Sequence, residues 1–175
     1  MSNALSSATV CGIQSQSKAL RGIFLIAFIG LLGVLTGKHV VWPIVRVVRG
    51  AQDGEAPGAV LTDIGLNLIS ALPAVLLLFG IGAAYRAFGR MTAGEIFSPA
   101  NVAGIRDIGA SMIAAAIAEL VVSPSLRGWI RGDTTIDIHF ADWALAVVVL
   151  GLALTFIARV LTLANQIKAE NDEIV

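Results

Sequence analysis

Ionisable side chains beside apolar stretches are the residues of this sequence that could do chemistry in a membrane. The ones nearest to hydrocarbon are Asp63, Asp107, Glu119 and Arg159. Such groups cost a few kcal/mol at the centre of a bilayer, so they usually mark a relay for protons or ions, or a pair. None of them falls near the middle of an apolar stretch. An interfacial role is therefore the main expectation, and a relay is the alternative.

Metal and nucleophile chemistry has less support. The two histidines, His39 and His139, have no defined spacing that would indicate a zinc site. The single Cys11 excludes an intrachain disulfide and a cysteine metal site. The sequence contains no G-x-S-x-G, H-E-x-x-H or phosphate-binding glycine loop. We expect no cofactor, no metal and no enzymatic activity, and an enzyme acting on lipid or a quinone ranks last.

The composition of the chain indicates which kind of secondary-structure element must position these residues. Hydrophobic residues make up 57% of the chain and charged residues 14%, whereas soluble domains carry about 25% charged residues. A soluble fold of 175 residues could not bury so much apolar surface. The sequence therefore predicts one all-α domain, a four-helix transmembrane bundle in the lipid bilayer. The net charge of zero gives no field for direct nucleic-acid binding.

Apolar segments of about 20 residues are the predicted spans. They are residues 19–41, 64–85, 105–122 and 143–163, joined by an inner loop (86–104) and outer loops (42–63 and 123–142), with a tail (164–175). Lys18 and Arg21 could open a cleaved signal peptide, but the following apolar run is too long for one, so we expect a retained span. Ser98-Pro99 predicts the start of a helix, with serine as N-cap.

The predicted outer loops and the second span carry two further patterns. Ile44–Val48 is rich in β-branched residues and 136–140 alternates apolar and polar residues, which favours a short β ribbon between the outer loops. Pro73 predicts a kink in the second span, with Asn67 and Ser70 shortly before it. Broken helices line binding sites in transporters, so a small transporter or channel subunit is the alternative function.

Small residues are spaced for close helix packing on two spans. Gly33 and Gly37, with Gly30 before them, lie on the first, and Ala110, Ala114 and Ala118 lie on the third. Internal packing is the main expectation. A homo-oligomer through Gly33 and Gly37 is the alternative.

Basic residues set the expected orientation. With the N-terminus inside, the inner segments hold Lys18, Arg21, Arg86, Arg90, Arg106, Arg159 and Lys168, and the outer loops hold Lys38, Arg46, Arg49, Arg127 and Arg131. The inner side therefore has the excess of basic residues. Because the number of spans is even, we expect both termini in the cytoplasm.

One set of residues resembles a known family. Phe88-Gly89-Arg90, Gly94-Glu95-Ile96-Phe97-Ser98-Pro99-Ala100-Asn101 and Ile105-Arg106-Asp107-Ile108-Gly109 are similar to the inner loop of the domain of unknown function 2975 family. The tail Ala169-Glu170-Asn171-Asp172-Glu173-Ile174-Val175 resembles its acidic ending, departing at Glu173. The resemblance implies a bacterial inner-membrane protein with four spans, often encoded beside a small helix-turn-helix regulator.

In this interpretation the inner loop and the tail lie on the same side of the membrane, and together they form the candidate interaction surface. Its residues are Gly94, Glu95, Phe97, Ser98, Asn101, Arg106, Asp107, Glu170, Asn171 and Asp172. For Arg106 and Asp107, anchoring at lipid headgroups is the main expectation, and a role in this interaction surface is the functional alternative. The expected function is a membrane-anchored interaction or regulatory protein that holds a cytoplasmic partner, for which the small helix-turn-helix regulator is the candidate.

Overall fold

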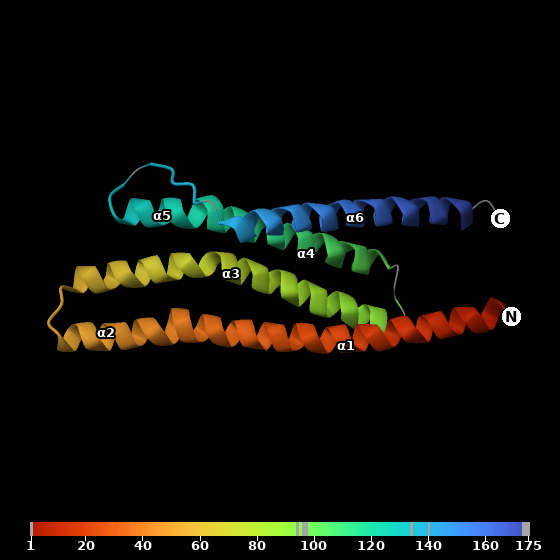
Figure 1. The fold of residues 1–175 in the computed structure, drawn as a ribbon, viewed down its shortest axis with the longest axis horizontal. Coiled ribbons are helices and arrows are strands. Elements are labelled where there is room, and N and C mark those ends of the chain that lie inside the picture. The colour runs from red at the N-terminus through yellow and green to blue at the C-terminus, as the bar shows by residue number, and fades with distance from the viewer. Residues whose placement is uncertain (1, 94, 96–97, 134, 140, 173–175) are drawn as a thin grey trace.

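The computed structural model describes residues 2–93, 95, 98–133, 135–139 and 141–172, with the backbone alone for 2–11, 13, 14 and 168–172. Figure 1 shows long helices running side by side. They are α1 (Ser2–Thr36), η1 (Gly37–Val41), α2 (Trp42–Gln52), α3 (Pro57–Thr92), α4 (Pro99–Ile117), η2 (Ala118–Val122), α5 (Ser123–Ile130) and α6 (Asp142–Asp172).

Four helical segments are long and apolar enough to cross a membrane. They are Ser15–Gln52, Pro57–Thr92, Pro99–Ile130 and Asp142–Ile167. The prediction of an all-helical fold with four apolar spans is confirmed, and this fold indicates a multi-pass membrane protein.

The predicted β ribbon is wrong. Ile44–Val48 lies inside α2, and 136–139 forms no strand in the described part of the chain. The π-helical turn η1 explains why the helix continues past Pro43: the Trp42 N–H bonds to the Gly37 carbonyl, five residues back. Pro43 lacks a backbone donor, and the wider turn accommodates it without ending the helix. The β-branched residues then extend an apolar helix face, which overrides their strand preference.

Helix also fills much of the predicted loops. α2 and the first turns of α3 occupy most of 42–63, and α5 lies within 123–142. On the opposite side, α4 begins after Ser98, whose side chain accepts a hydrogen bond from the Asn101 N–H at 3.3 Å. The predicted N-cap is confirmed.

The helices pack in series. α1 packs against α3, α3 against α4, and α4 against α6. Among the described residues, α1 makes no extensive contact with α4 or α6. Figure 1 accordingly shows α1 and α6 at the two edges, with both termini at the same end. Each inner helix thus has two protein neighbours, and each edge helix has one.

Small residues allow a close backbone contact between α4 and α6. A Cβ at Gly109 would lie 2.6 Å from the Gly151 carbonyl oxygen, and a Cβ at Gly151 would lie 2.8 Å from the Gly109 carbonyl oxygen. Ala144, Gly151 and Ala158 recur every seven residues on α6, and both alanines are buried. The expected ladder is only partly correct, because Ala118 is buried whereas Ala110 is exposed.

The glycines of the first span are arranged differently. A Cβ at Gly30, Gly33 or Gly37 would meet no atom within 4 Å among the described residues. The expected internal packing of these glycines is therefore wrong, because they face away from the other helices. A homo-oligomer through Gly33 and Gly37 stays a prediction.

Contacts between helices show which residues lie at the same level along the helix axes, which is called their height here. A Cβ at Gly89 would lie 3.7 Å from Cζ of Arg21, and Arg90 Nε donates to Asn101 Oδ1 at 3.0 Å. These contacts bring Arg21 of α1, Arg90 of α3 and Asn101 of α4 to nearly one height.

The contact between Gly109 and Gly151 extends this height to α6. Asn101 precedes Gly109 by eight residues, and Arg159 follows Gly151 by eight residues on the antiparallel helix. Arg159 therefore shares the height of Arg90 and Asn101. With Arg86 and Arg106 about one turn deeper, these residues form what we call the inner arginine belt: Arg21, Arg86, Arg90, Arg106 and Arg159.

The opposite boundary lies at a constant distance from this belt. A spacing of seventeen residues recurs from Arg21 to Lys38, from Arg90 to Pro73 and from Arg159 to Asp142. At 1.5 Å per residue this corresponds to about 26 Å of helix, close to the ~30 Å hydrocarbon thickness of a bilayer. What lies beyond is called the outer head here: α2, residues 57–72 of α3, α5, and the described residues 131–133 and 135–139.

Candidate functional site

Two clusters of polar side chains lie at opposite ends of the helices, and the first is at the base of the outer head. His39 is buried, and its Nδ1 lies 2.6 Å from Asn67 Oδ1 and 2.9 Å from the Asn67 carbonyl oxygen. Because both Asn67 atoms are acceptors, we assign the ring proton to Nδ1. Ser70 Oγ donates to the same Asn67 carbonyl at 2.7 Å. This network joins η1 to α3.

Proline residues beside this network leave backbone carbonyls without a helical hydrogen bond, and groups from other segments donate to these carbonyls. Pro73 has no N–H, so the Ile69 carbonyl four residues back loses its helical partner. The hydroxyl of Ser123, which is fully buried, donates to that carbonyl at 3.3 Å. The proline of α3 is therefore compensated by a serine from α5.

Pro124 creates the same situation on the third span. The carbonyl that it leaves free is that of Leu120, and the backbone N–H of His139 donates to it at 2.9 Å. Ser125 Oγ lies 3.1 Å from the Asp137 carbonyl oxygen and accepts from the Asp137 N–H at 3.2 Å. Asp137 and His139 are thus hydrogen-bonded to the third span, which precedes them in the chain.

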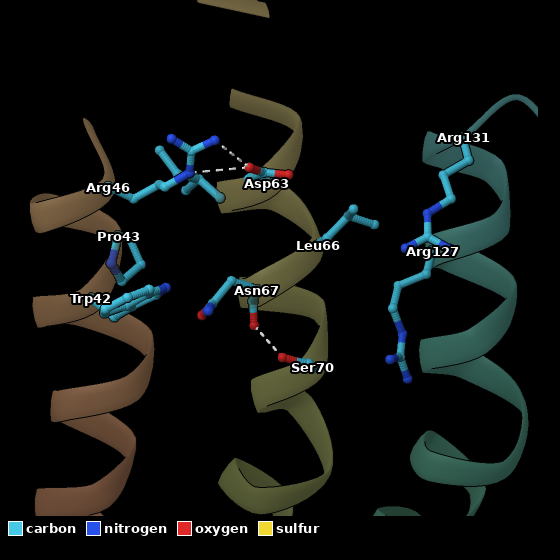
Figure 2. A pocket seen from close by; sticks show the side chains of 10 residues that line it. Trp42, Pro43, Arg46, Asp63, Leu66, Asn67, Ser70, Arg127 and Arg131 are labelled. Atoms are coloured by element: carbon cyan, nitrogen blue, oxygen red, sulfur yellow. Dashed lines mark hydrogen bonds and ion pairs between the residues drawn. The ribbon is translucent and has the colours of Figure 1, made fainter. Parts of the chain in front are cut away.

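A cavity of about 350 Å³ opens above this network, between α2, α3 and α5. Its lining includes Arg127 of α5 and Arg131, which follows α5, together with Asn67 and Ser70 of α3. Figure 2 shows both arginine side chains on the side of α5 that faces α3, and the Asn67 side chain turned toward Trp42. Arg127 Nε donates to the Ser123 carbonyl at 3.1 Å. Neither arginine forms an ion pair with a described residue.

Arg46 closes the α2 side of the cavity. Its guanidinium lies 2.7 Å from Glu55 Oε2 and 3.1 Å from Asp63 Oδ2, and Figure 2 shows the contact with Asp63. This ion-pair cluster joins α2, the turn and α3. Asp63, predicted as an interfacial carboxylate, has its place in this cluster of the outer head.

Acidic groups line a second outer cavity, of about 530 Å³, on the other side of Arg127 and Arg131. They are Glu119, Asp133 and Asp137, and His139 joins them. Hydrogen bonds from the Thr135 N–H and hydroxyl lower the pKa of the Asp133 carboxyl. His39 belongs to the network with Asn67, so the structure places the two histidines in different clusters.

The second polar cluster lies at the inner end, where α3 turns into α4. Asn101 is 1% exposed. Its Oδ1 accepts from Arg90 Nε at 3.0 Å, its Nδ2 donates to the Glu95 carbonyl, and Arg90 also donates to the Ala100 carbonyl at 2.8 Å. Gly104 leaves room for this guanidinium, because a Cβ there would lie 3.0 Å from Arg90 Nη2.

The residues of the candidate interaction surface fall into three groups. Asn101 is buried, Ser98 is half-buried, and Glu95, Arg106 and Asp107 are exposed, the last two forming an ion pair at 3.6 Å. Gly94 and Phe97 lie outside the described residues. Glu170, Asn171 and Asp172 belong to α6, where the backbone alone is described.

Sequence reasoning missed several functional candidates. It did not identify the cavity arginines Arg127 and Arg131, or the bond from Ser123 to α3. The sequence did contain a signal for the Ser123 bond. Pro73 must leave a backbone carbonyl without its helical donor, and a serine hydroxyl is a donor that can bind this carbonyl instead. The contact across α3 and α5 could not be deduced, because one sequence does not say which helices are neighbours.

Comparison with known sequences gave one family match. The family described as "Protein of unknown function (DUF2975)" matches residues 27–175, which is most of the chain. The comparisons with curated proteins and with solved structures gave no match.

Proposed function

This chain belongs to the DUF2975 family of proteins of unknown function, and from that starting point we propose that it is a membrane-anchored regulatory protein holding a cytoplasmic partner. The partner class is a small helix-turn-helix regulator. The protein acts in the bacterial inner membrane with both termini in the cytoplasm, where the inner arginine belt agrees with the positive-inside rule.

The observation that carries this proposal is a pair of helical arms on the termini side. α1 begins at Ser2, well before Arg21 at the belt, and α6 continues to Asp172, well past Arg159. At 1.5 Å per residue the two arms extend roughly 20–30 Å beyond the belt. Figure 1 shows both arms at the end where α3 turns into α4. Helices outside the bilayer without a membrane role offer a surface for a soluble partner.

The connection between α3 and α4 supports the same proposal. Arg90 and Asn101 hold this connection through their hydrogen bonds, and Asn101 is buried while doing so. Its role is therefore to position the neighbouring residues, and Glu95 is the exposed side chain that it positions. A surface residue whose backbone is already held in place loses less entropy when a partner binds.

The test is co-purification of the full-length protein with the product of the adjacent gene after co-expression. We expect a stoichiometric complex in mild detergent. Asn171→Ala together with Asp172→Ala should reduce the retained partner by about tenfold, because lost polar contacts at an interface typically cost 1–2 kcal/mol.

Arg49→Ala is the matched control, since Arg49 is exposed on the outer head and forms no ion pair with a described residue. This variant should retain the partner fully. Absence of a complex with the unaltered protein would refute the proposal. Equal losses in the tail and control variants would refute the assignment of the tail.

A transporter or channel subunit has weaker support. The outer cavity contains Asn67 and Ser70, but broken transporter helices bind substrate near the middle of the bilayer. Pro73 lies seventeen residues from Arg90 and so at the outer boundary. In the middle, Gly109 and Gly151 bring the backbones of α4 and α6 into contact.

A further inference from the structure

A basic cavity lies between α1 and α3 at the height of the inner arginine belt. Its volume is about 400 Å³, and its charged lining residues are Arg21, Arg86, Arg90 and Glu95. Three cations therefore face one carboxylate. None of the three arginines forms an ion pair with a described residue, so the cavity has positive charge that the protein itself does not neutralise.

The guanidinium of Arg21 is held in a fixed position. Its Nη2 donates to the Tyr85 hydroxyl at 2.9 Å, and its Cζ lies 4.8 Å from the centre of the Tyr85 ring. The side chain rests over Gly89, where a Cβ would lie 3.7 Å from Arg21 Cζ. Neither partner carries a negative charge, so Arg21 is oriented but not neutralised.

Arg86 and Arg90 complete the cationic lining. A Cβ at Gly82 would lie 3.6 Å from Arg86 Nη1 and 3.8 Å from Phe28 of α1, so Arg86 lies along the groove between the two helices. Arg90 is held by Asn101 and the Ala100 carbonyl, which are neutral acceptors. All three arginines line the same cavity, and guanidinium groups are strong donors to an oxyanion.

The surroundings of the cavity fit a lipid better than a soluble anion. It lies at the hydrocarbon boundary, and Phe24 of α1 stacks on Phe88 of α3 with ring centroids 5.3 Å apart. α1 is an edge helix, and apolar side chains such as Ile23 and Ile26 are 60% and 73% exposed on it. Acyl chains can cover this face while the headgroup enters the cavity.

We propose that this cavity binds the phosphate of an anionic phospholipid from the leaflet nearer the termini. Arg21 and Arg86 contact the phosphate oxygens, Arg90 adds positive charge, and the acyl chains lie along α1 and α3. This inference does not rest on the helical arms or the tail, because its phosphate contacts are Arg21 and Arg86 in the groove between two spans.

The test is native mass spectrometry of the full-length protein in detergent, titrated with phosphatidylglycerol or with phosphatidylcholine of the same acyl chains. We expect phosphatidylglycerol to bind about tenfold more tightly, because two charge-assisted contacts discriminate the anionic headgroup. Arg21→Gln combined with Arg86→Gln should abolish this preference. Tyr85→Phe retains every cation and should keep most of it.

Arg106→Gln combined with Arg159→Gln is the matched control, because it removes the same charge from the same belt but on α4 and α6. This pair should keep the preference for phosphatidylglycerol. The proposal is overturned if the two lipids bind equally, if the control loses the preference as well, or if millimolar inorganic phosphate displaces the lipid. The last result would identify a site for free phosphate instead. Unchanged elution in size-exclusion chromatography verifies that each variant is folded.

Discussion

Pro73 and Pro124 each leave one carbonyl without its helical hydrogen bond, and in both cases a group distant in sequence binds it. Ser123 serves the carbonyl of Ile69, and the His139 N–H serves that of Leu120. In a membrane protein an unsatisfied carbonyl costs several kcal/mol where water is absent. The prolines therefore determine which neighbours the helices need at the outer boundary.

Ser123→Ala tests this compensation. The substitution leaves the Ile69 carbonyl without its donor and should destabilise the protein by about 1–3 kcal/mol, the cost of an unsatisfied buried acceptor. In a Pro73→Ala background the backbone N–H gained at position 73 can restore the helical bond to the same carbonyl, so the cost of Ser123→Ala should fall well below that value. The measurement is unfolding in SDS followed by far-UV circular dichroism, as a double-mutant cycle. Additive effects would show that the hydroxyl does not serve this carbonyl.

At the scale of the helices, two glycines with similar sequence contexts have opposite surroundings. Gly109 lies where α4 touches α6, and Gly33 lies where α1 faces no described residue of the chain. Both belong to helices with similar small residues, so the sequence pattern alone does not separate them.

Gly109→Ala and Gly33→Ala make a matched pair. The first places a Cβ about 2.6 Å from a backbone oxygen of α6, forcing the helices apart at an expected cost of about 1–3 kcal/mol. The second should be neutral or stabilise by up to about 1 kcal/mol, because alanine favours helix over glycine. The same SDS unfolding assay compares them. A destabilising Gly33→Ala would contradict an open α1 face and indicate that a second chain covers it.

The helices themselves were largely predictable, and the details of their ends were not. Apolar runs identified all four spans, and Ser98-Pro99 identified the start of α4. The error at Ile44–Val48 arose because the β-branched residues were weighed without the preceding helix, which continues past Pro43 through a π-helical turn. Strand propensity over so few residues is weak evidence against a helix that is already formed.

The candidate sites were less predictable than the fold, because they depend on side chains brought together across helices. Arg90 and Asn101 were both in the segment that resembled the family, yet the sequence suggested a docking role for Asn101, and the structure buries it. Arg21 and Arg86 were counted only as charges that orient the chain. Their convergence on one groove requires knowing that α1 and α3 are neighbours.

For the whole molecule, the number of spans determines where the termini lie. Four helices are long and apolar enough to cross a membrane. An even number of crossings would return the chain to the side on which it began, and by the positive-inside rule the inner arginine belt favours the cytoplasm for that side. Reporter fusions at residues 1 and 175 should therefore both show cytoplasmic activity, and a fusion at Asp53, between α2 and α3, should show none. Opposite results for the two termini would exclude an even number of crossings.

The first helical stretch runs from Ser2 to Gln52 through α1, η1 and α2 without leaving the helical path. It joins the outer head to the inner arm, and among the described elements its extensive contacts within the layer are with α3 alone. Because no loop interrupts this stretch among the described residues, the arm of α1 and the α2 part of the outer head belong to one continuous helical path, with the π-helical turn at Gly37–Val41 as an irregular segment within it. A rotation of α2 about the helix axis would therefore act on the arm directly and not through a flexible connection.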